Sequence, residues 1–110
     1  WAGYHAFDRD MEKVVKHYSN MGVKGFKVDF MDRDDQEIVN FLYRGAETCA
    51  KYKMMVDYHG ICKPTGLQRT YPNVINYEGV HGLENMKWAA SPYGCRSDGL
   101  YTGRHAQCDP

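Results

Sequence analysis

One stretch of the sequence decides the fold: Gly25-Phe26-Lys27-Val28-Asp29-Phe30-Met31-Asp32-Arg33-Asp34-Asp35-Gln36. It opens as a short apolar run and ends in a cluster of carboxylates, which is the pattern of a buried parallel strand emerging from a sheet. In an α/β barrel the carboxyl ends of the strands carry the chemistry. Asp29 is therefore a candidate catalytic carboxylate; the alternative is a structural role, as a loop cap or ion-pair partner.

Two further short strands are predicted, at residues 54–58 and 74–77, and each runs out into polar residues. Apolar residues at helical spacing predict one helix that begins at Asp8 or Asp10 and ends at Gly22. A second helix is predicted to begin at Asp34 or Asp35, with Asp34 and Glu37 at capping-box spacing. The segment 61–72 holds two prolines and a glycine and predicts a loop, and a short helical piece is expected over residues 83–88.

This order of helices and strands is typical of consecutive βα units in a parallel sheet, so the fold class is α/β. A whole (β/α)8 TIM barrel needs about 250 residues, whereas the chain has 110 residues. We therefore expect about three βα units of an incomplete barrel. Residues 91–110 are rich in glycine and polar residues without periodicity, and little regular structure is expected there.

The charge balance argues against several classes of partner. The 14 Lys and Arg residues equal the 14 Asp and Glu residues, so neither a nucleic acid nor a membrane partner is expected. No run is apolar enough to span a bilayer, and the first residues do not resemble a signal peptide. The four cysteines have no zinc-type spacing, while a disulfide remains open.

Four carboxylates lie at or just beyond predicted strand ends: Asp29, Asp57, Glu78 and Glu84. Cleavage of a glycosidic bond needs two carboxyl groups, one to protonate the leaving oxygen and one to attack the anomeric carbon or activate water. Strands two apart face each other across a barrel mouth, so Asp29 and the segment from Glu78 to Glu84 can form such a pair. Loop-stabilising ion pairs, or metal ligands, are the alternatives.

Longer motifs carry a family resemblance. They are residues 22–36 (GVKGFKVDFMDRDDQ), 55–60 (MVDYHG) with 63–73 (KPTGLQRTYPN), and 76–84 (NYEGVHGLE). These runs resemble the barrel motifs of glycoside hydrolase family 97, and the resemblance extends over residues 8–90. It implies an α-glycosidase barrel over residues 1–90, completed by the rest of the barrel and by flanking domains. Residues 91–110 depart from the family, because the apolar strand expected after Trp88 is missing.

The resemblance also implies a mechanism. Inverting members carry a base glutamate at the position of Gly60, whereas retaining members have an aspartate nucleophile at the position of Asp29. We therefore expect retaining hydrolysis of terminal α-glycosidic bonds, α-galactosides above all, with Asp29 as nucleophile and Glu84 as acid/base. The alternatives are an inverting α-glucosidase relative and an inactive fragment that at most binds sugar or calcium.

Calcium, a sugar substrate and a cellular location follow from the same resemblance. It implies a calcium ion bound by Glu78 and Glu84, an oligosaccharide or α-galactoside substrate, and a periplasmic or secreted parent protein. Four further residues are candidates for binding the sugar, each with a structural role as the alternative: Asp57, His59, Arg69 and Trp88.

Overall fold

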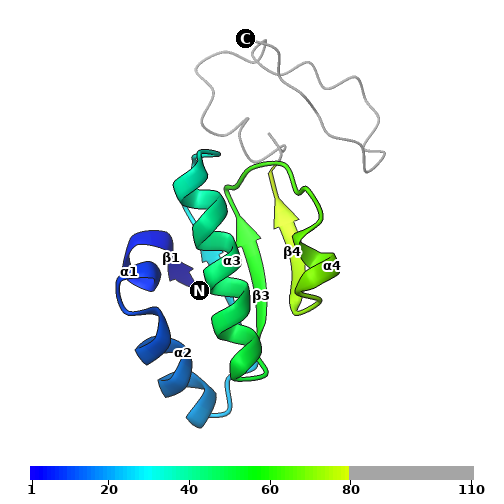
Figure 1. Ribbon diagram of the computed structural model, residues 1–110. Helices are drawn as coiled ribbons and strands as arrows, with labels where there is room; N and C mark the ends of the chain where they lie inside the picture. Colours follow the sequence, from blue (N-terminus) through cyan, green and yellow to red (C-terminus); the bar gives the residue numbers. More distant parts are fainter. Residues whose placement is uncertain (80–110) are drawn as a thin grey trace, which may run out of the picture. The chain divides into compact units, whose positions relative to one another are not determined.

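A computed structural model describes residues 1–79, which form a parallel sheet with helices packed against it (Figure 1). The sheet has four strands in the order of the sequence: β1 (Ala2–Gly3), β2 (Gly25–Asp29), β3 (Met55–His59) and β4 (Val74–Glu78). Every neighbouring pair is parallel. The α/β prediction is confirmed, and a consecutive parallel sheet of this kind is compatible with part of a barrel. The predicted helical piece at 83–88 and the tail at 91–110 lie outside the described residues.

Within residues 1–79, four helices accompany the strands: α1 (Tyr4–Arg9), α2 (Met11–Asn20), α3 (Gln36–Lys51) and α4 (Leu67–Thr70). Helix α3 lies in front of the sheet in Figure 1. Its N-cap residue is Asp35, whose Oδ1 accepts a hydrogen bond from the backbone N–H of Ile38 at 3.1 Å. The predicted cap is thereby resolved in favour of Asp35 over Asp34. No transmembrane helix is found among residues 1–79, since none is long and apolar enough to cross a bilayer.

The predicted start of α2 is only partly right. Asp10 occupies the N-cap position but makes no side-chain capping bond, and its Oδ2 accepts a hydrogen bond from Arg9 Nε at 2.7 Å. The predicted end is correct: Gly22 follows the helix with a left-handed φ of 87°. The prediction of a continuous loop over residues 61–72 is wrong, since the single helical turn α4 lies within it, after Gly66 with a φ of 114°.

The core lies between the helices and one face of the sheet. Alternate strand residues point toward the helices, so the buried positions on β2 and β3 are Phe26, Val28, Val56 and Tyr58. Tyr58 is fully buried, and its hydroxyl donates a hydrogen bond of 2.8 Å to the carbonyl of Leu42 on α3. Helix α3 can approach this hydroxyl because residue 45 is a glycine: a Cβ there would lie 2.6 Å from Tyr58 Oη.

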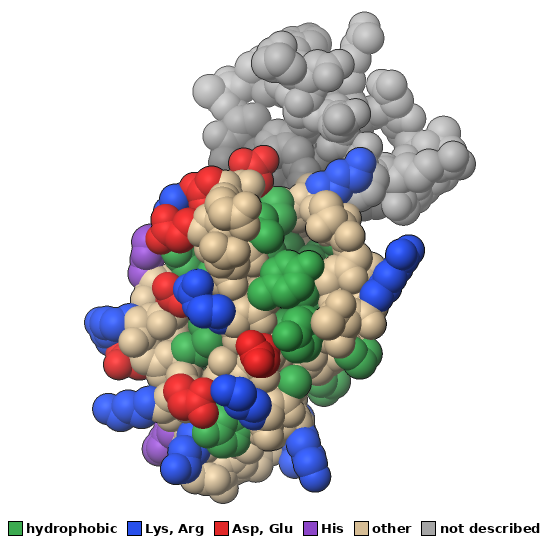
Figure 2. All heavy atoms as spheres, in the orientation of Figure 1, with side chains coloured by type: hydrophobic (Ala, Val, Ile, Leu, Met, Phe, Trp, Pro, Cys, Tyr) green, Lys and Arg blue, Asp and Glu red, His purple; other side chains and the backbone are tan. Residues whose placement is uncertain are grey.

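The intervening strand residues point to the opposite face of the sheet, and most of them are polar. They are Lys27 and Asp29 on β2, Asp57 and His59 on β3, and Asn76 and Glu78 on β4. In a closed (β/α)8 barrel this face is the interior. On the helix side, Figure 2 shows acidic and basic side chains interspersed, without a large patch of one sign. The polar face thus concentrates the chemically useful groups of the sheet.

Candidate active site

The predicted strand-end residues meet at one edge of the sheet because all four strands run in the same direction. Asp29 pairs with Gly3 in the strand register, and His59 pairs with Glu78. The second of these pairings depends on a one-residue shift between Val56 and Asp57. Without that shift His59 would lie opposite Tyr77, so the irregularity brings two ionisable side chains together.

Asp29 is the last residue of β2, and several hydrogen-bond donors surround its carboxylate. Its Oδ1 accepts the backbone N–H of Phe30 at 2.8 Å, and its Oδ2 lies 3.4 Å from both Lys27 Nζ and Trp1 Nε1. Burial by itself raises the pKa of Asp29, since its side chain is only 16% exposed, but these three donors outweigh burial and lower the pKa below its ordinary value. Asp29 is therefore held as a carboxylate at neutral pH, as a nucleophile requires.

The two cations near Asp29 in the sequence have different roles. Lys27 lies two residues earlier on the same face of β2 and forms the ion pair with Asp29. Arg33 instead binds Asp35, and its guanidinium also reaches Glu37 Oε2 at 2.8 Å, so it belongs to the beginning of α3. Lys27 therefore helps keep Asp29 ionised, whereas the Arg33 guanidinium is paired with carboxylates at the beginning of α3.

The backbone around Asp29 is unusually bent. Phe30 and Asp32 both have left-handed φ angles, 69° and 48°, and so does Gly60 at the end of β3, at 65°. The N–H of Asp32 donates to the carbonyl of Gly60 at 2.8 Å, which joins the two strand ends. A Cβ at Gly60 would lie 3.1 Å from Asp32 Oδ1 and 3.5 Å from Asp29 Oδ1. Because Gly60 has no side chain, the space immediately beside the candidate nucleophile stays open. Left-handed backbone conformations like those of Phe30 and Asp32 cluster at functional sites.

A second group of polar side chains lies next to Gly60, on β3 and β4. His59 has Nε2 2.9 Å from Asp57 Oδ1, and its Nδ1 is bonded to Glu78 Oε2. Asn76 Nδ2 donates to the same Asp57 oxygen at 3.1 Å. The backbone carbonyl of Glu78 also accepts the N–H of Gly60 at 3.0 Å. Three of the predicted site residues are therefore brought together, and Asn76 joins them.

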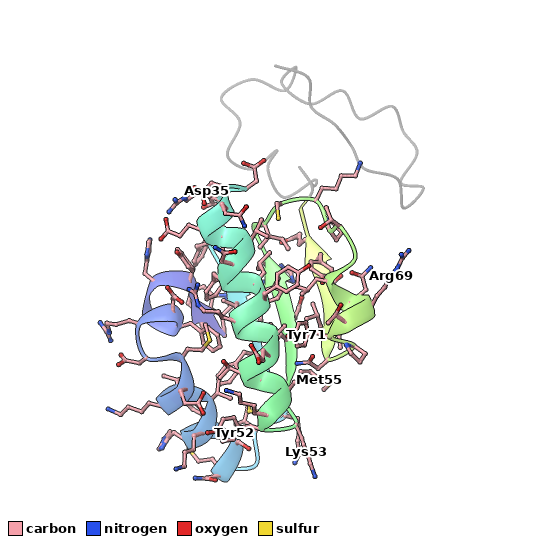
Figure 3. All side chains as sticks on the ribbon, in the orientation of Figure 1. Asp35, Tyr52, Lys53, Met55, Arg69 and Tyr71 are labelled. Atoms are coloured by element: carbon pink, nitrogen blue, oxygen red, sulfur yellow. The ribbon has the colours of Figure 1, made fainter. Side chains whose placement is uncertain are left out.

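The other predicted site residues are not part of this group in the described structure. Arg69 is exposed on α4 and points away from the sheet (Figure 3), without a side-chain hydrogen bond or ion pair to residues 1–79. Glu84 and Trp88 lie outside the described residues. The roles of these residues remain predictions. A pocket of about 240 Å³ lies elsewhere, between α3 and the segment 61–67, and Asp29 does not line it.

Two site residues carried no clear signal in the sequence. Trp1 contacts Asp29, and its ring packs edge-on against Phe30 with centroids 5.2 Å apart, but an isolated tryptophan gives no indication of its partner. Asn76 lies inside a short strand, and only the shifted register places it beside Asp57. Both contacts depend on pairing between strands, which local patterns do not specify.

Sequence similarity to known proteins shows the family. Residues 1–80 match the family model described as Glycoside hydrolase 97. The chain belongs to the glycoside hydrolase 97 family. A protein named retaining alpha-galactosidase, from Bacteroides thetaiotaomicron, is 71% identical over 90 residues, which are 82% of this chain and 14% of the relative.

A second relative is more distant. A protein named probable retaining alpha-galactosidase, from Streptomyces bingchenggensis, is 34% identical over 86 residues, which are 76% of this chain and 14% of the relative. The chain thus spans about one seventh of the length of either curated relative. The predicted membership of the family is confirmed.

Proposed function

We propose that this chain contributes the nucleophile and the acid/base to a retaining α-galactosidase, in an enzyme whose remaining barrel strands close the open edges of the sheet. The supporting observation is the position of Asp29, a carboxylate of lowered pKa at a strand end with Gly60 beside it. Both relatives described above are named as retaining α-galactosidases, one of them as probable.

The reaction is a double displacement. Asp29 attacks the anomeric carbon of the α-galactoside while Glu84 protonates the departing oxygen, and a covalent galactosyl-enzyme forms with inverted configuration. Water then attacks that carbon with Glu84 acting as base, the bond to Asp29 breaks, and galactose leaves with its original α configuration. The lowered pKa of Asp29 suits this role because only the carboxylate is nucleophilic.

Gly60 disfavours the inverting alternative. An inverting enzyme needs a second carboxylate that activates water, with more room between the two carboxyl groups. At position 60 there is no side chain, and even a Cβ would lie 3.1 Å from Asp32 Oδ1. Position 60 therefore supplies no carboxylate beside Asp29 that could act as the base of an inverting mechanism.

Calcium is part of the proposal, with Glu78 and Glu84 as ligands. Carboxylate oxygens suit calcium, which takes six to eight oxygen ligands. Glu78 has a half-exposed side chain whose Oε2 is bonded to His59, and within residues 1–79 no group of three or more His, Cys, Asp and Glu side chains is arranged to hold a metal. We therefore propose that Glu84 and further carboxylates from outside the described part complete the site. A bound calcium ion would supply positive charge that positions these side chains and polarises the substrate.

The configuration of the first product tests the proposal. The complete enzyme is mixed with an aryl α-galactoside, and proton NMR follows the anomeric signals before mutarotation. We expect α-galactose to appear first, and the aryl α-glucoside to be a poorer substrate. Initial release of β-galactose would contradict retention, and hydrolysis of neither substrate would contradict the proposed activity.

A further inference from the structure

We propose that Asn76, Asp57 and His59 form a positioning network for Glu78 and do not themselves bind the sugar. The inference rests on the proposed function and deepens it, because it separates residues that touch the substrate from residues that hold the active-site edge in place. It differs from the sugar-binding roles predicted for Asp57 and His59 from the sequence. The network runs across β3 and β4 through three side-chain contacts.

The hydrogen-bonding capacity of His59 is fully used inside this network. An imidazole has two ring nitrogens, and those of His59 face Asp57 Oδ1 at 2.9 Å and Glu78 Oε2. The His59 side chain is 16% exposed, whereas that of Glu78 is 46% exposed. The more enclosed imidazole therefore supports the more accessible carboxylate, and a sugar hydroxyl could bond to His59 only by displacing one of the two carboxylates.

Asp57 is fixed in turn from β4. Its Oδ1 accepts Asn76 Nδ2 at 3.1 Å in addition to the contact with His59. The shifted register is what allows this, since it places Asn76 opposite Asp57 and Glu78 opposite His59. Irregularities of strand pairing commonly re-aim side chains next to active sites. The same irregularity thus creates every cross-strand contact of the network.

Glu78 is consequently held by its side chain and by its backbone. Its carbonyl accepts the N–H of Gly60 at 3.0 Å, and Gly60 is the residue that lies against Asp29. These two contacts together fix the carboxyl end of β4 relative to Gly60 and Asp29. Partners that orient functional carboxylates in this way affect activity strongly although they do not touch the substrate.

The test separates kcat from KM in the complete enzyme. His59→Ala, His59→Gln and Asn76→Ala are compared with the exposed control His17→Ala, using an aryl α-galactoside and inhibition by galactose. We expect kcat to fall about 10- to 100-fold in His59→Ala, with KM and the galactose inhibition constant within about twofold of wild type. His59→Gln should recover part of the loss because its amide still bonds to one carboxylate, and Asn76→Ala should show a smaller loss of kcat.

A rise in KM and in the galactose inhibition constant with unchanged kcat would overturn the inference, since it would make His59 a sugar ligand. Unchanged kcat in both His59→Gln and Asn76→Ala would also overturn it.

A readout independent of turnover is the NMR signal of the hydrogen-bonded His59 ring N–H in enzyme labelled with ¹⁵N-histidine. We expect that signal in wild type and its loss or displacement in Glu78→Gln; its persistence unchanged would contradict the network. An enzyme inactive on α-galactosides would refute the proposed function and leave this spectroscopic result to decide the network.

Discussion

Substituting Gly60 by alanine should lower the kcat/KM of the enzyme for a reason that can be worked out from the structure. The backbone of Gly60 has a φ of 65°, and an L-residue in the left-handed region costs about 1–2 kcal/mol. The new Cβ would also lie 3.1 Å from Asp32 Oδ1 and 3.5 Å from Asp29 Oδ1. The neighbouring Asp32 must therefore move by a few tenths of an ångström, and the Asp29 loop is displaced with it.

Gly22→Ala provides the matched control. Gly22 has a φ of 87°, so its substitution carries a similar backbone cost, but nothing lies within 4 Å of a Cβ built there. Both variants should therefore lower the free energy of unfolding by about 1–2 kcal/mol. Because misplacing a reacting group by even about 1 Å can cost on the order of 100-fold in rate, we expect Gly60→Ala alone to lose about tenfold or more in kcat/KM.

The assay measures thermal unfolding and hydrolysis of an aryl α-galactoside for both variants of the complete enzyme. The expected pattern is similar destabilisation in the two variants and a loss of kcat/KM confined to Gly60→Ala. Equal activity of Gly60→Ala and Gly22→Ala would refute the reasoning, because it would show that the space beside Asp29 is not needed.

Two other substitutions test the described contacts. Lys27→Met removes a cation that lies 3.4 Å from Asp29 Oδ2 and helps lower the Asp29 pKa. The pKa of Asp29 should therefore rise, and the acid limb of the kcat/KM–pH profile should move to higher pH. The control Lys24→Met, at an exposed position, should leave that limb in place. An unmoved limb in Lys27→Met would exclude this electrostatic role. Gly45→Ala should destabilise α3 because its Cβ would lie 2.6 Å from Tyr58 Oη. Tyr58→Phe deletes that oxygen. In unfolding measurements, Tyr58→Phe should therefore lower the free energy of unfolding less in the Gly45→Ala background than in wild type. Strict additivity of the two changes would contradict the steric account.

The regular elements could be predicted because their signals are local. The strands predicted at residues 54–58 and 74–77 lie within about a residue of β3 and β4, and the predicted start of the second helix includes the observed N-cap Asp35. Strand β1 has only two residues and shows no alternation, so it was missed. Helix α4 is a single turn flanked by Gly66 and Pro72, where the loop signals outweigh the helical ones.

Only those parts of the site that lie within a single segment of the sequence could be predicted. Asp29 could be located because it ends a recognisable strand, and Gly60 because the motif that contains it resembles the family motif. The contacts of Asn76 and Glu78 with β3 depend on the register shift after Val56, and a one-residue shift changes which side chains face each other. No pattern within a single strand encodes that shift, so the network of His59 became visible only in the folded sheet.

Chemical rescue of Asp29→Ala tests the central claim most directly. The variant of the complete enzyme should lose turnover of an aryl α-galactoside, because the group that attacks the anomeric carbon is gone. Azide added in its place should restore release of the aryl group and yield β-galactosyl azide, identified by NMR. An Asp29→Ala enzyme that remains active without azide, or a rescued product with the α configuration, would contradict the assignment of Asp29 as the nucleophile.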